Sequence, residues 1–196
     1  MLHAETAAIL QSLQGLLVDG RTGTLLLLLC AAAIVDCRTH RIPNLLVLTG
    51  AVFGVAYNTL YPLFPQYTIV FPLAGLALGL CLFLPLYALK AMGAGDVKLM
   101  AMVGAFLGPL ATLKAAICTV IAGGVLAILY VVARGTALRM WHNLAAQIQA
   151  SALGAAAGSP HVPHISAAGS AGRLPYAVAI AAGTFAFLVM HRLGFL

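Results

Sequence analysis

Two aspartates stand out in this chain because acids are rare in it. Only four of the 196 residues are Asp or Glu. Glu5 and Asp19 lie near the amino terminus, whereas Asp36 and Asp96 each stand at the end of a long uncharged run. An ionisable side chain is costly to keep beside so much apolar sequence, so its default interpretation is functional.

A pair of carboxylates has a definite chemistry. Two carboxylates a few ångströms apart cannot both ionise cheaply, so they share one proton. The charged member takes a proton from water as that water attacks a carbonyl carbon, and the neutral member donates its proton to the carbonyl oxygen. If the side chains of Asp36 and Asp96 lie together, we predict that the protein hydrolyses a bond at a carbonyl carbon. This reaction requires neither a metal nor a covalent nucleophile.

The rest of the sequence is typical of a membrane protein. Hydrophobic residues make up 63% of the chain, charged residues 7%, and the mean hydropathy is +1.06, whereas soluble domains are about half apolar and a quarter charged. We therefore predict an all-α polytopic membrane protein in which residues 22–196 form six transmembrane helices. The uncharged runs that carry these helices are 22–35, 42–89, 99–113, 115–133 and 174–190, and the second is long enough for two spans of about 20 residues.

Helix length and charge place both acids at one membrane face. The run 22–35 gives about 21 Å of helix at ~1.5 Å per residue, which is shorter than the ~30 Å hydrocarbon slab, so Asp36 is drawn into the boundary. The run 99–113 is also shorter than the hydrocarbon slab, at about 22 Å of helix, so Asp96 is likewise drawn into the membrane boundary. With both termini outside, seven of the ten basic residues lie inside, as the positive-inside rule favours. The inner residues are Arg38, Arg41, Lys90, Lys98, Arg134, Arg139 and Arg173, and the outer ones are Arg21, Lys114 and Arg192.

Two segments outside the spans carry no predicted chemistry. Residues 1–21 have apolar side chains at helical spacing, which indicates an amphipathic helix at the membrane interface. Residues 134–173 form a long inner loop rich in Ala, Gly and Ser, which we interpret as a flexible linker. Its His161 and His164 have no acid or cysteine nearby, and the four cysteines form no CxxC pair, so we expect neither a metal nor a cofactor.

The net charge of +6 favours membrane lipid as a partner because the basic residues gather at the inner face. No soluble segment interleaves basic and aromatic residues, so we expect no nucleic-acid partner. The oligomeric state stays open at this point.

The residues around the acids suggest how each would be used. Gly93 and Gly95 would let an extended substrate backbone approach Asp96, and they permit unusual backbone angles. Asp36 would lie at the carboxyl end of its helix and Asp96 at the amino end of the next, so the helix dipoles favour Asp36 as the resting acid and Asp96 as the base. The structural alternatives are that Asp96 only caps its helix and that Asp36 is a solvated loop residue. Lys98 is interpreted as an anchor that reaches lipid phosphates.

The segments DCRTHRIPN (residues 36–44) and GAGDVKL (residues 93–99) together resemble the type IV prepilin peptidases, membrane aspartyl proteases whose second aspartate lies in a GxGD motif. The order is specific: an aspartate ending the first span, then a basic residue with Ile-Pro-Asn, then GxGD with Lys two positions on. The similarity covers roughly residues 25–134, and RLPYAVAIA at 173–181 looks like the family's final span.

Carried over position by position, the resemblance implies that Asp36 and Asp96 are the catalytic pair and that Gly93 and Gly95 shape substrate binding. It implies a prepilin or pilin-like precursor as the substrate, cut at the cytoplasmic face of the bacterial inner membrane. Long family members carry an inserted cysteine-rich domain and also methylate the new amino terminus. Only residues 39–44 intervene here, so methyltransferase activity is not expected, and the chain looks like the small peptidases of tight-adherence (Flp) pilus systems.

Two other functional classes fit so apolar a chain. A proton-coupled transporter would relay protons through the acids, although such proteins tend to place acids near mid-membrane and often show repeated halves. A non-catalytic subunit of a pilus assembly platform would use the acids only as helix caps. Replacing each aspartate by asparagine separates these alternatives, because asparagine preserves a cap and destroys an acid pair.

Overall fold

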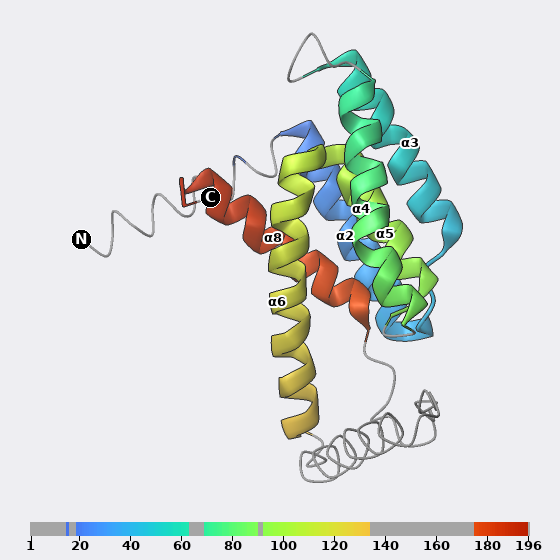
Figure 1. The fold of residues 1–196 in the computed structure, drawn as a ribbon, viewed down its shortest axis with the longest axis vertical. Coiled ribbons are helices and arrows are strands. Elements are labelled where there is room, and N and C mark those ends of the chain that lie inside the picture. The colour runs from blue at the N-terminus through green and yellow to red at the C-terminus, as the bar shows by residue number, and fades with distance from the viewer. Residues whose placement is uncertain (1–14, 16–18, 63–68, 90–91, 134–174, 196) are drawn as a thin grey trace, which may run out of the picture. The chain divides into compact units, whose positions relative to one another are not determined.

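The computed structural model describes residues 15, 19–62, 69–89, 92–133 and 175–195. The elements in these ranges are six helices (Figure 1), one for each predicted span. The helices are α2 (Gly20–Thr39), α3 (Asn44–Leu60), α4 (Val70–Ala88), α5 (Ala94–Leu107), α6 (Pro109–Ala133) and α8 (Tyr176–Arg192).

The chain divides into two compact units. The first comprises residues 1–123 and 175–196, and the second comprises residues 124–174. Of the second unit, the structure describes only residues 124–133, the last part of α6. The aspartates and the helices that carry them belong to the first unit.

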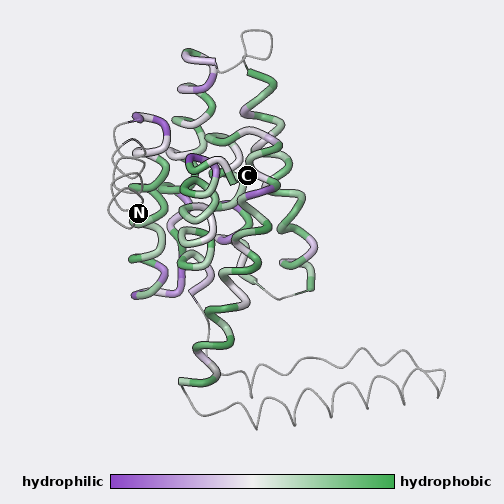
Figure 2. Tube along the Cα trace, turned by 90° about the vertical axis from the view of Figure 1, so that its left-hand side faces the viewer, coloured by the Kyte–Doolittle hydropathy of each residue, from purple (hydrophilic) through white to green (hydrophobic). Residues whose placement is uncertain are grey.

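The described helices expose apolar surface on a scale that requires a membrane. Three of them, α2, α4 and the first 22 residues of α6, are long and apolar enough to cross one, and α3 and α8 are shorter apolar helices. Large side chains such as Leu27, Leu45 and Leu110 are 72%, 72% and 77% exposed, whereas soluble monomers rarely expose large apolar patches. Figure 2 shows hydrophobic colour along most of the helix lengths. These features indicate a multi-pass membrane protein; the number of six spans stays a prediction.

Helix α5 lies at the centre of the first unit and carries one of the two acids. From Leu99 to Leu107 every residue is buried, and the helix packs chiefly on α4 and α3. Gly104 of α5 meets Gly75 of α4 so closely that a Cβ on either would strike the other's backbone. Small residues allow such close helix approach inside membranes, so the glycines hold α5 in place.

Helix α8 runs antiparallel to α2, with a contact at each end. At one end Arg192 of α8 lies 4.0 Å from Asp19, the cap of α2. At the other end the first turn of α8 contacts Asp36 in the last turn of α2. The chain therefore returns to the aspartates at its final helix.

Several sequence predictions fall outside the described residues. These are the loop 134–173 with its two histidines, and most of the interfacial helix predicted over residues 1–21. The last two residues of that segment differ from the prediction, because Gly20 and Arg21 already belong to α2.

Candidate active site

The fold brings Asp36 and Asp96 to the same end of the first unit, although 60 positions separate them in sequence. Asp36 lies in the last turn of α2 and Asp96 in the first turn of α5. Their side chains are buried, with 6% and 8% of the residue surface exposed. The two are close enough for the charge of Asp36 to act on Asp96. The fold therefore places both acids at one end of the unit, as a meeting of the two would require.

Asp96 occupies the third position of α5 rather than the cap position expected from the sequence. The cap is Gly93, and its N–H donates to Asp96 Oδ2 at 3.0 Å. This is the acidic half of a capping box, in which a side chain at the third helical position reaches back to the cap N–H. The acid therefore has a structural role at the start of α5, one that an asparagine oxygen can also fill.

Asp96 precedes the uncharged run 99–113 and lies outside the helices long enough to span a membrane. Burial raises the pKa of Asp96 from 3.8 to about 6; the Gly93 hydrogen bond acts in the opposite direction, and the charge of Asp36 raises it further. Desolvation disfavours the charged form of a carboxyl group. This environment favours the neutral form of Asp96, whereas helix position alone favours Asp96 as the base, so burial and the helix dipole act in opposite directions on this residue.

Asp36 has a hydrogen-bond partner that sequence reasoning missed. The backbone N–H of Ala177, in the first turn of α8, donates to Asp36 Oδ2 at 3.2 Å, across 141 positions. Asp36 thus lies at the carboxyl end of α2 and also in front of the amino end of α8, where a dipole favours negative charge. A backbone amide has no sequence signature, and the one available signal is Pro175 near the start of the final apolar run, where a proline favours the beginning of a helix.

The two glycines of the GxGD motif adopt ordinary backbone conformations. Gly93 has φ −81° and ψ 155°, and Gly95 is helical, so neither uses the unusual backbone angles that glycine permits. At Gly95 an added Cβ would lie 3.2 Å from Cβ of Ile42, in the turn between α2 and α3. Gly95 therefore makes room for Ile42, and its role in binding a substrate stays a prediction.

A second contact joins the same turn to α5. Lys98 Nζ donates to Asn44 Oδ1 at 3.0 Å, and both residues are exposed. Asn44 opens α3 and Lys98 follows Asp96 by two positions. The Ile-Pro-Asn segment and the GxGD motif, distant in sequence, are therefore packed together beside the acids.

In the part of the chain that the structure describes, no basic side chain forms an ion pair with Asp36 or Asp96. No group of three His, Cys, Asp or Glu side chains within those residues could hold a metal. The chemistry that the arrangement supports is proton sharing between two carboxylates, each of which accepts one backbone N–H.

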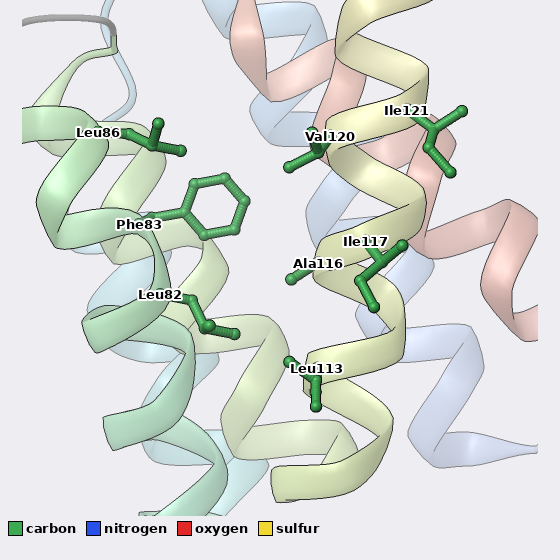
Figure 3. A pocket seen from close by; sticks show the side chains of 8 residues that line it. All are labelled: Leu82, Phe83, Leu86, Leu113, Ala116, Ile117, Val120 and Ile121. Atoms are coloured by element: carbon green, nitrogen blue, oxygen red, sulfur yellow. The ribbon is translucent and has the colours of Figure 1, made fainter.

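A separate groove of about 260 Å³ lies between α4 and α6 (Figure 3), lined by the eight side chains labelled there. Phe83 and Ala116, which are buried, lie at its base, whereas Ile117 and Val120 are exposed. All eight side chains are apolar, so none can transfer a proton or attack a substrate. The groove therefore supplies no side chain for proton transfer, and the two aspartates stay the candidate site.

Comparison with known proteins identifies the family. Residues 23–132 match the sequence model of the type IV leader peptidase family. This stretch runs from α2 into α6 and contains both aspartates and both motif glycines, whereas α8 lies outside it. Searches among curated proteins and among solved structures found no significant match. Because the matched stretch covers more than half of the 196 residues, the chain belongs to the type IV leader peptidase family, as its motifs predicted.

Proposed function

We propose that the protein is an aspartyl endopeptidase that removes the leader peptide from prepilin or pilin-like precursors, with Asp36 and Asp96 as its catalytic pair. The observation that carries the proposal is the convergence of these two scarce acids, both buried, at one end of the first unit. A buried acid whose pKa is raised by burial and by a neighbouring charge, as that of Asp96 is, is typical of functional sites. The family supplies the general activity, that of a leader peptidase.

The environments of the two acids suggest complementary roles. Asp96, whose pKa burial raises to about 6, carries the shared proton and donates it to the carbonyl oxygen of the scissile peptide. Asp36, which accepts the Ala177 N–H, takes a proton from the water that attacks the carbonyl carbon. The resulting diol collapses as the C–N bond breaks. Asp36 then gives its proton to the leaving amine, and a diol hydroxyl returns a proton to Asp96.

The proposed place of cleavage is the cytoplasmic face of the bacterial inner membrane, with both termini outside. The excess of basic residues on the aspartate side of the predicted topology supports this orientation. A precursor whose apolar helix lies in the bilayer would present its leader junction at that boundary. Substrate binding beside Gly93 and Gly95 is part of the proposal, and methylation of the product is not.

The test is co-expression of this protein with a pilin precursor in bacterial membranes, for wild type, Asp36→Asn and Asp96→Asn. Precursor shortening and the sequence and mass of the new amino terminus are the readouts. Asp19→Asn is the matched control, because it makes the same chemical change at a helix cap away from the pair. We expect wild type and Asp19→Asn to cleave, and each pair variant to lose cleavage by at least about 100-fold at normal membrane levels.

The alternatives predict other results. An asparagine oxygen still accepts the N–H of Gly93 or Ala177, so acids that serve only as caps would leave cleavage intact in both pair variants. A transporter would lose proton-coupled flux in the same variants without any shortening of the precursor. Either result would contradict the aspartyl mechanism.

A further inference from the structure

The amino end of α8 is capped by a side chain from another helix. Its cap residue, Pro175, makes no side-chain hydrogen bond, and the first amides of a helix lack partners within the helix. The N–H of Val178 donates to the Pro175 carbonyl at 3.1 Å. The N–H of Ala177 donates instead to Asp36 Oδ2 at 3.2 Å. Asp36 thus takes the place that Ser, Thr, Asp or Asn usually fills at a helix start.

Packing holds this amide in a fixed position. Ala177 and Ile180 have no exposed surface, and α8 lies along α2. Further along, Gly183 approaches the backbone of Thr119 on α6 so closely that a Cβ would not fit. The Ala177 N–H therefore belongs to a closely packed part of the backbone, and its hydrogen bond restrains the side chain of Asp36.

We propose that the main-chain amide of Ala177 is a positioning group for Asp36, which holds the carboxylate in the orientation in which Asp36 acts as the base. The role rests on the proposed function. Both the hydrogen bond and the dipole of α8 favour negative charge at this point. The amide belongs to a helix outside the matched stretch 23–132, so it adds to the site a part that the motifs do not contain.

The competing explanation is that Asp36 merely caps α8 and that the contact matters only for stability. Substitutions of Pro175 distinguish the two explanations. In Pro175→Ser the new hydroxyl can accept the Ala177 N–H, since that of Val178 is already bonded to the residue 175 carbonyl. The serine would thus cap α8 and release Asp36. Pro175→Ala is the matched control, because it removes the proline and adds no acceptor.

For Pro175→Ser we expect a thermal stability equal to or above that of Pro175→Ala, since an added cap stabilises a helix. We expect kcat for precursor cleavage to fall by about 10- to 100-fold, the range that a hydrogen bond to a charged group is worth, with KM unchanged. A stabilising change that lowers kcat is not what a purely structural contact would produce. If kcat in Pro175→Ser equals that in Pro175→Ala, the proposal is overturned.

A second variant removes the donor itself. Ala177→Pro deletes the amide, and Tyr176→Pro, at the first helical position where proline is well tolerated, deletes its neighbour. We expect the kcat loss in Ala177→Pro and wild-type kcat in Tyr176→Pro. Equal effects in the two variants would assign the loss to the helix start and not to this amide.

An infrared measurement tests the positioning role without any cleavage. The carboxylate stretching band of Asp36, assigned by its absence in Asp36→Asn, should shift in frequency between Pro175→Ala and Pro175→Ser, because the serine withdraws the Ala177 N–H from the carboxylate. The charge of Asp36 acts on Asp96, so both spectra are repeated in Asp96→Asn to remove the second carboxyl group. A shifted band in a protein that cleaves no precursor would support the role of the Ala177 amide and contradict the peptidase function. An unshifted band in a protein that does cleave the precursor would support the peptidase function and overturn the role of the amide.

Discussion

Polar residues are buried at both ends of the first unit, and the two ends differ in what surrounds them. At the end away from the acids, Arg21 is 9% exposed; its Nη2 donates to the Tyr61 carbonyl at 3.2 Å, and its guanidinium lies over the Tyr57 ring. Asn58 Nδ2 lies within 3.1 Å of the carbonyls of Ala105 and Phe106, where Pro109 has no N–H to offer α5. Polar groups at this end join helices.

At the other end, Asp36 and Asp96 each accept one backbone N–H, and in the described part of the chain neither has a cation beside it. Two buried acids without a counter-charge weaken a fold. Proteins keep such arrangements at functional sites, where activity and stability conflict. Polar groups at one end are therefore arranged for stability, whereas those at the other end fit the proposed proton transfer, and this contrast can be tested by mutation.

The largest effect is expected for Asp96→Asn, which should remove cleavage and also stabilise the protein at neutral pH. The pKa of Asp96 rises from 3.8 to about 6 on folding, so the native state binds this proton more tightly. The stability it contributes is present below pH ~4 and is lost as the pH rises through about 6. Asparagine does not titrate, so at pH 7 the variant should be more stable by on the order of 2 kcal/mol.

Thermal unfolding in detergent at pH 4 and pH 7 checks this prediction. The stability gain should be present at pH 7 and vanish at pH 4. A loss of stability at pH 7 would show that the carboxylate is needed as a cap, and the contrast between the two ends would fail.

The second effect concerns the pH profile of the wild-type enzyme. If Asp96 is the general acid, kcat/KM for cleavage should fall as the pH rises through about 6, by about tenfold per pH unit. Initial rates at low precursor concentration give this profile. A rate that stays flat up to pH 9 would take the acid role away from Asp96.

The third prediction probes the opposite end. Asn58→Leu removes the amide that binds the last carbonyls of α5, and unpaired buried carbonyls should lower the free energy of unfolding by about 1–3 kcal/mol. The specific activity of the folded protein should not change. Thr59→Val is the control, because that hydroxyl donates within its own helix, to the Val55 carbonyl. Lost activity in folded Asn58→Leu would mean that this end also serves the reaction.

The fourth prediction tests the contact between the two motifs. Gly95→Ala would place a Cβ 3.2 Å from that of Ile42 and should lower activity severalfold through a small shift of the α5 start. Ile42→Ala in the same chain should restore it. Gly124→Ala is the control, since nothing lies within 4 Å of its added Cβ. A double variant no better than Gly95→Ala would indicate that the glycine faces the substrate instead.

The smallest effect is expected for Lys98→Gln. The Lys98 to Asn44 hydrogen bond is exposed, and exposed polar pairs contribute about 0–1 kcal/mol. Cleavage assays should therefore show a change of less than about threefold. A loss comparable to that of Asp96→Asn would place Lys98 in the reaction itself.

The sequence by itself determined the helical class, the six apolar segments, the family and the two acids. These follow from local properties, because an uncharged run has to be helical in a bilayer and a scarce acid at its end is conspicuous. The order of the motifs was enough to predict the family that residues 23–132 confirm.

The environment of each acid, by contrast, depends on the tertiary structure. Helix position alone favoured Asp36 as the acid, because it considers only the dipole of each residue's own helix. In the fold, α8 places a second helix end before Asp36, and packing around α5 removes Asp96 from water. The burial of a side chain depends on all the residues packed around it, most of them distant in sequence. The amide that binds Asp36 likewise lies 141 positions away, so no local pattern of residues could have revealed either feature.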